Sequence, residues 1–222
     1  MALAFTIPNL IQFYTFISPI FISLFLLFKS TMDYVPMRGL TYIIGVLLNY
    51  LFAMLIKTIF YGLDRSKITA GQPTQFQRKP IQMNWPLHPG QTANSMPDYC
   101  NVFEGPWYNS ALSNTSMPST NAMFHAFTFA YICVSVAQNP NPVGVPFLLL
   151  IGITALTNMF YRVSLYCDKI MDIAVGIVLG GAFGVGWWFL VNALNPTYTF
   201  YGKEDNLKQC KLSKTKFRCT YS

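Results

Sequence analysis

The sequence predicts an all-α membrane protein, a bundle of about five transmembrane helices. Three observations lead to this prediction. Hydrophobic residues make up 53% of the 222-residue chain and charged residues only 10%, and the mean hydropathy is positive. Soluble domains carry about 25% charged residues. Five apolar runs come close to, or exceed, the roughly 20 residues that cross a bilayer as a helix. Turn-forming residues gather between these runs, so a single membrane bundle is predicted.

The five expected spans follow one another along most of the chain. The first is expected to stay in the membrane and to bend near Pro19, because proline cannot donate the helical hydrogen bond. The third has a favourable start, since Pro118 suits a first turn and the Ser119 hydroxyl can cap free amides. The predicted spans cover residues 10–28, 40–61, 122–137, 143–160 and 168–194.

Two polar segments complete the predicted organisation. Residues 62–117 are rich in turn formers and carry two tryptophans, so this segment is expected to lie along the membrane face. We assign it, with the five spans, to a helical bundle over residues 1–194. Residues 195–222 form a basic tail, because six of the 15 Lys and Arg residues lie between Lys203 and Arg218. This tail accounts for most of the net charge of +7 and favours anionic lipid or an acidic partner.

Small residues and cysteines raise separate expectations. Gly176, Gly180 and Gly184 recur at four-residue spacing in the last span, a stripe typical of close helix packing. The five cysteines show no zinc spacing. By the predicted topology, Cys100 and Cys167 share one face of the membrane, and Cys210 and Cys219 share the other. Either pair is able to form a disulfide bond if its face is oxidising.

Three polar clusters are expected on one face of the membrane. Five spans place the end of the second, the start of the third and the start of the fifth on the same side. An oxygen-rich, basic pocket with helix N-termini pointing into it suits a phosphate headgroup. The candidate residues of this headgroup site are Lys57, Arg65, Ser119, Asn121, Arg162, Asp168 and Asp172.

The same clusters resemble the three motifs of the type 2 phosphatidic acid phosphatase family. SMPSTNAMFHAF is similar to its second motif, which reads Pro-Ser-Gly-His or, in the dolichyl diphosphatase branch, Met-Pro-Ser-Ser-His. RVSLYCDKIMDIAVGIVLGG is similar to the third, an Arg followed after five residues by His and after three more by Asp. NYLFAMLIKTIFYGLDRSK resembles the first, a Lys followed by Arg-Pro. The resemblance covers residues 40–194 and implies a lipid phosphate or diphosphate as substrate.

This sequence departs from the motifs at the two positions whose side chains carry out the chemistry in the family. The resemblance implies that Asp168 stands where the family has its nucleophilic His, and Asn121 where the family has the His that protonates the leaving oxygen. Arg162, Ser119 and Asp172 match retained positions. The first motif fits only with a one-residue slip between Lys57 and Arg65, and Ser66 follows where proline is expected. Because an amide has no titratable proton, Asn121 cannot act as the general acid.

Several of these residues have structural alternatives. Asp168 also suits the N-cap of the fifth helix, and Arg162 with Asp168 or Asp172 also suits an interfacial ion pair. Lys57 also suits a membrane-end anchor. His125 lies one turn after Asn121, where it is either a replacement acid or a histidine hydrogen-bonded inside the bundle.

The sequence therefore favours a membrane protein of this fold that has lost catalysis and that has a structural or adaptor role. The polar segment and the tail would link a membrane to a protein layer, as in the internal membrane and shell of a large virus; the endoplasmic reticulum is a second candidate membrane. Two alternatives remain: an active lipid phosphate phosphatase using His125 or Asp168, and a non-catalytic binder of phosphorylated lipid. No metal or cofactor motif is apparent, and no nucleic-acid partner is expected.

Overall fold

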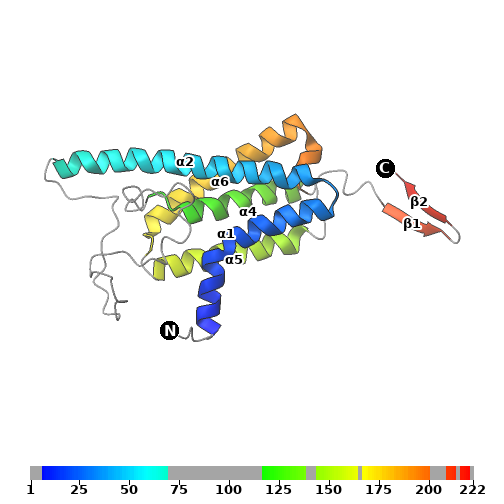
Figure 1. Cartoon of the computed structure of the whole chain (residues 1–222), viewed down its shortest axis with the longest axis horizontal. Coiled ribbons are helices and arrows are strands. Elements are labelled where there is room, and N and C mark those ends of the chain that lie inside the picture. The colour runs from blue at the N-terminus through cyan, green and yellow to red at the C-terminus, as the bar shows by residue number, and fades with distance from the viewer. Residues whose placement is uncertain are drawn as a thin grey trace.

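The computed structural model describes residues 7–69, 117–138, 144–164, 167–200, 209–213 and 216–220. Five helices account for most of them (Figure 1). Their bounds are α1 Ile7–Met32, α2 Pro36–Thr69, α4 Thr120–Gln138, α5 Gly144–Ser164 and α6 Ile170–Leu194. The short 3-10 helix η2, Pro196–Tyr198, follows α6. The predicted all-α membrane fold is thus confirmed.

Four of the described helices are long and apolar enough to cross a membrane: the part of α2 up to Leu63, and all of α4, α5 and α6. Within the part of α1 whose side chains the structure describes without a gap, the apolar stretch runs over Ile17–Met32. Pro19 lies inside α1, and the ribbon bends sharply between its N-terminal part and the rest (Figure 1). Proline is a common cause of such a bend, because it removes one hydrogen bond and its ring clashes with the preceding turn.

The second helix continues beyond its predicted end. We expected a polar segment from residue 62, whereas α2 runs on to Thr69. No proline occurs between Gly62 and Thr69, so nothing local forbids the helix from continuing out of the apolar region. The rest of the expected polar segment, up to residue 116, lies outside the described residues.

Helix α4 lies at the centre of the bundle. In the most apolar 18-residue stretch of α4, 61% of the residues are buried, whereas the share in the corresponding stretches of α2, α5 and α6 is 22–28%. It packs most extensively against α6, where the three stripe glycines are buried against its backbone. A Cβ atom at Gly176 would lie 2.8 Å from the Ser119 carbonyl oxygen, and one at Gly184 would lie 3.0 Å from the Phe127 Cα. The prediction that this stripe serves close helix packing is confirmed.

The end of the bundle nearer η2 is closed by aromatic packing and hydrogen bonds. Tyr42 and Tyr131 belong to one buried cluster with Phe127, Trp188 and Phe200. Arg38, which is 1% exposed, donates a 2.9 Å hydrogen bond from Nε to the Thr197 carbonyl. The segment after α6 is therefore held against α2, and the polar cluster described below lies at the opposite ends of α4 and α6.

Two short strands occur in the basic tail. They are β1, Gln209–Ser213, and β2, Lys216–Thr220, which pair antiparallel with Cys210 opposite Cys219. The sequence did not predict this hairpin. Cys167 takes part in a disulfide bond, while Cys100, its predicted partner, lies outside the described residues. Cys133 is a free thiol within α4.

Candidate functional site

A buried carboxylate, guanidinium and hydroxyl meet where α4 and α6 begin and α5 ends. The Arg162 Nε donates to Asp168 Oδ2 at 2.5 Å, and the Ser119 hydroxyl donates to the same oxygen at 2.7 Å. The side chains of Arg162 and Asp168 are 4% and 0% exposed, and Ser119 is fully buried. We call Ser119, Arg162 and Asp168 the polar triad.

Backbone contacts fix the positions of all three residues. The Cys167 amide donates to the Arg162 carbonyl at 2.8 Å, which folds the chain back between α5 and α6 and brings Asp168 towards Arg162. The Ser119 amide donates to the Asp172 carbonyl at 3.1 Å, which ties the start of α4 to the first turn of α6. Gly176 allows this approach because it has no side chain facing Ser119. The triad is thus positioned by the α4–α6 contact.

The expected capping role of Asp168 is replaced by this ion pair. The N-cap residue of α6 is Lys169, and the carboxylate that caps the helix belongs to Asp172, whose Oδ2 accepts from the Lys169 amide at 3.1 Å. Asp168 precedes the cap by one residue, so its carboxylate is directed to Arg162 and Ser119 instead. The alternative of an Arg162 ion pair therefore holds for Asp168, and Asp172 has a separate role.

The remaining predicted residues are distributed differently. Asn121 is 6% exposed in the first turn of α4 and lines a groove towards α1 and α2. Lys57 is 1% exposed in α2. The side chain of Arg65 lies outside the described residues. The structure thus brings together Ser119, Arg162 and Asp168, with Asp172 joined through its backbone.

His125 is a buried bundle residue in the structure. Its side chain is 0% exposed, and Nε2 lies 3.2 Å from the Ser18 hydroxyl of α1. Its Nδ1 has no hydrogen-bond partner among the described residues, so no hydrogen bond joins the imidazole to the triad. The alternative of a histidine hydrogen-bonded inside the bundle describes this arrangement.

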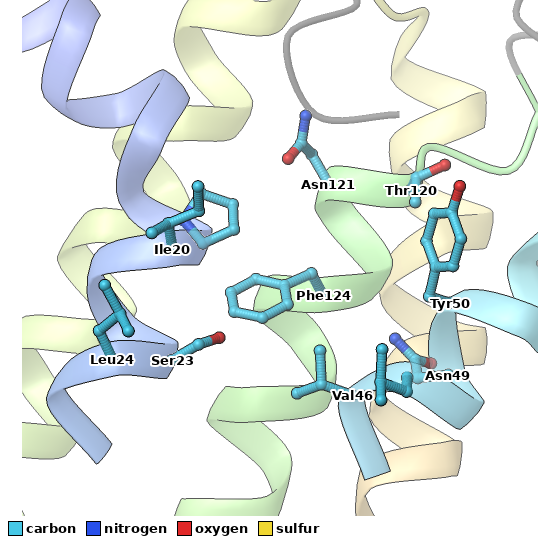
Figure 2. A pocket seen from close by; sticks show the side chains of 11 residues that line it. Ile20, Ser23, Leu24, Val46, Asn49, Tyr50, Thr120, Asn121 and Phe124 are labelled. Atoms are coloured by element: carbon cyan, nitrogen blue, oxygen red, sulfur yellow. The ribbon is translucent and has the colours of Figure 1, made fainter. Parts of the chain in front are cut away.

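The groove that Asn121 lines has a volume of about 300 Å³. Ile20 and Leu24 of α1, Val46 of α2 and Phe124 of α4 form its apolar walls (Figure 2). Asn49, Tyr50 and Thr120 supply further polar groups. The sequence shows Asn49 as a polar residue within an apolar span, but which helices it faces depends on the three-dimensional arrangement.

The chemistry available at the triad is anion recognition. A guanidinium and a hydroxyl that both donate to one oxygen form a cradle for an anion, and in this structure Asp168 supplies that anion. Among the described residues, no group of three or more His, Cys, Asp or Glu side chains is placed to hold a metal ion. Nor does a described histidine donate to, or accept from, the triad.

Comparison with protein families identifies the superfamily of this chain. The family model described as the PAP2 superfamily matches residues 46–196, which is more than half of the chain and includes all three triad residues. No curated protein and no solved structure gives a significant match. The matched region runs from within α2 to the start of η2, and so contains the helices that position the triad. The chain therefore belongs to the PAP2 superfamily, as an integral membrane protein with several transmembrane helices.

Proposed function

We propose that this protein is a catalytically inactive member of its superfamily with a structural role in a membrane. One observation carries the proposal: the Asp168 carboxylate accepts hydrogen bonds from both Ser119 and Arg162 inside a closed, buried cluster. The anion cradle is therefore filled by the chain itself. A substrate phosphate would have to displace a carboxylate that is covalently held in place, and it would be repelled by the charge of that carboxylate.

The residue types at the two chemical positions support the same conclusion. Asn121 has no proton that it can transfer near neutral pH. Asp168 is a weak nucleophile while its carboxylate is bound by a guanidinium, because the hydrogen bonds stabilise the charge that attack would consume. Asp172 holds the first turn of α6 through the Lys169 amide. In this reading the headgroup site is vestigial: Ser119 and Arg162 retain their polar groups but serve the fold.

A structural role accounts for what the bundle retains. The helices bury polar groups between them and present apolar surfaces that a bilayer can cover. The basic C-terminal tail would attach this bundle to an acidic protein layer or to anionic lipid. An assembly that joins a membrane to a protein shell, such as a virus particle with an internal membrane, is a setting that would need such an adaptor.

The first test is a phosphate-release assay on purified full-length protein in detergent micelles. Phosphatidic acid, lysophosphatidic acid and an isoprenyl diphosphate serve as substrates, and an active lipid phosphatase in the same micelles serves as the positive control. We expect no release above the protein-free background for any substrate. Arg162→Ala, Asp168→Asn and His125→Gln variants are assayed in parallel, and each is expected to equal the wild type.

Turnover by the wild type that disappears in Arg162→Ala would overturn the proposal. The other two variants would then identify the group responsible. Loss in His125→Gln would indicate a general acid displaced by one helical turn, whereas loss in Asp168→Asn would indicate an aspartyl nucleophile. Size-exclusion chromatography and thermal unfolding of each variant separate loss of turnover from loss of fold.

A second prediction concerns the filled cradle. Asp168→Ala should open an anion site between Ser119 and Arg162, so inorganic phosphate should raise the unfolding temperature of this variant. A ligand at 100 times its Kd adds about 2.7 kcal/mol of stability. Neither the wild type nor Asp168→Ala/Arg162→Ala should respond to phosphate. An equal phosphate response in the wild type would show that Asp168 does not occupy the cradle, and would favour a binder of phosphorylated lipid.

A further inference from the structure

We propose that the groove between α1, α2 and α4 binds a neutral, single-chain lipid whose headgroup carries hydroxyl groups, as a monoacylglycerol does. This inference goes beyond the proposed function and is independent of it, because the groove is a separate surface from the polar triad. It rests on the shape of the groove, on two unpaired polar atoms and on the absence of charge among the lining residues.

The apolar part of the groove suits one hydrocarbon chain. Ile20 and Leu24 lie on one side and Val46 on the other, with the Phe124 ring between them (Figure 2). Ile20 and Leu24 are 48% and 58% exposed, so this side of the groove faces the surface that a bilayer covers. A volume of about 300 Å³ is at the lower end of the roughly 300–1,000 Å³ of small-molecule sites, which favours a single chain.

Two polar atoms at this groove lack the partners that burial requires. The Asn49 Oδ1 and the Thr120 hydroxyl are buried and have no hydrogen-bond partner within the described part of the chain. Asn49 as a whole is 3% exposed. Because nine-tenths or more of buried polar groups in proteins are paired, such atoms point to a missing ligand.

The type of each atom specifies the headgroup. The Asn49 Oδ1 only accepts, so it needs a donor, and the Thr120 hydroxyl can donate or accept. A lipid hydroxyl satisfies both requirements, whereas an ether or ester oxygen cannot donate to Asn49. Figure 2 shows Thr120 and Asn121 at one end of the groove and Asn49 beside Val46 in its wall, so a headgroup with more than one hydroxyl suits the distance between them.

Charge excludes a phosphorylated headgroup from this groove. All eleven residues that line it are uncharged. A phosphate held there would lose its hydration without gaining a cation, which is costly in a site of low dielectric constant. The groove therefore differs from the triad, where Arg162 provides a positive charge, and the ligand that it suits is neutral.

The test uses full-length protein in phosphatidylcholine nanodiscs and a monoacylglycerol with a diazirine in its acyl chain. Matched probes are its dimethyl ether, which cannot donate, and its phosphorylated form, a lysophosphatidic acid. After irradiation, labelled peptides from α1, α2 and α4 are quantified by mass spectrometry. We expect saturable labelling by the diol at about ten times the level of the ether, because the ether cannot donate to the buried Asn49 Oδ1, and weak labelling by the phosphorylated form.

Variants assign the effect to the groove. In Asn49→Leu/Thr120→Val the ratio of labelling by the diol to labelling by the ether should fall to near one. Leu24→Trp should block labelling by both probes, because the larger side chain fills the groove. Leu156→Trp, at a similarly exposed position in a separate furrow between α4, α5 and α6, is the matched control and should label as the wild type does.

Three results would overturn the proposal. Equal labelling of the wild type by diol and ether would remove the need for a hydroxyl. Labelling spread over all membrane-facing helices would indicate only the surrounding lipid. Preference for the phosphorylated probe would place the headgroup at a charged site. The wild-type comparison of probes requires no substitution, so it stands even if a variant fails to fold. Phosphate release is measured separately, so the two proposals can fail independently.

Discussion

Replacing Arg162 by alanine is expected to destabilise the protein by about 3–5 kcal/mol, the usual cost of removing one partner from a buried ion pair. The substitution removes the guanidinium that pairs with the Asp168 carboxylate, whose side chain is 0% exposed. An isolated charge is far more costly to bury than a neutral group of similar size. Denaturant unfolding in mixed micelles measures the loss.

A double-mutant cycle separates the charge effect from lost packing. Arg162→Ala/Asp168→Ala removes both charges, so it should recover a large part of the stability lost in Arg162→Ala, although it removes more atoms. Lys29→Ala is the matched control, because the Lys29–Asp33 pair has the same 2.5 Å separation but side chains that are 25% and 30% exposed. Exposed pairs contribute about 0–1 kcal/mol.

If Arg162→Ala were no more destabilising than Lys29→Ala, the large stabilising contribution assigned to the Arg162–Asp168 ion pair would be wrong. A double variant less stable than Arg162→Ala would point the same way, because it would attribute the loss to packing. These outcomes bear on the proposed function as well, since a weak pair could yield its place to a substrate phosphate.

The sequence predicts the helices well because their signals are local. A run of about twenty apolar residues specifies a membrane helix whatever its neighbours are, and the spacing of Gly176, Gly180 and Gly184 specifies a face before any partner is known. The end of α2 was less predictable. Beyond residue 62 the apolar signal ends, but polar residues without proline are compatible with either helix or loop, so the continuation to Thr69 was missed.

The sequence predicted which residues form the site, but it predicted the contacts between them less well. Motif spacing singled out Ser119, Arg162 and Asp168, and the structure brings these three together. Whether Asp168 caps α6 or pairs with Arg162 depends on how the chain folds back between α5 and α6, where the Cys167 amide donates to the Arg162 carbonyl, and residue spacing alone does not specify that fold-back. The groove near Asn49 was missed for a similar reason, because its lining comes from three helices that are far apart in the sequence.

The close approach of α4 to α6 leads to the second large effect. Gly180→Ala should destabilise the protein by about 3 kcal/mol, the upper end of the usual cost of overpacking. A Cβ atom at this position would lie 2.7 Å from the Met123 Cα and 2.8 Å from its carbonyl carbon. These are backbone atoms of a central helix, so no side-chain rotation can relieve the clash and the two helices must separate.

The adjacent glycine provides the control, and the expected change there has the opposite sign. A Cβ atom at Gly181 would meet nothing within 4 Å, and alanine stabilises a helix by up to about 1 kcal/mol relative to glycine. Gly181→Ala should therefore be neutral or slightly stabilising in the same unfolding assay. Equal effects at the two positions would mean that the α4–α6 distance is not set by the glycine stripe. It would also remove the physical reason for the Ser119–Asp168 contact, because that contact depends on the same approach at Gly176.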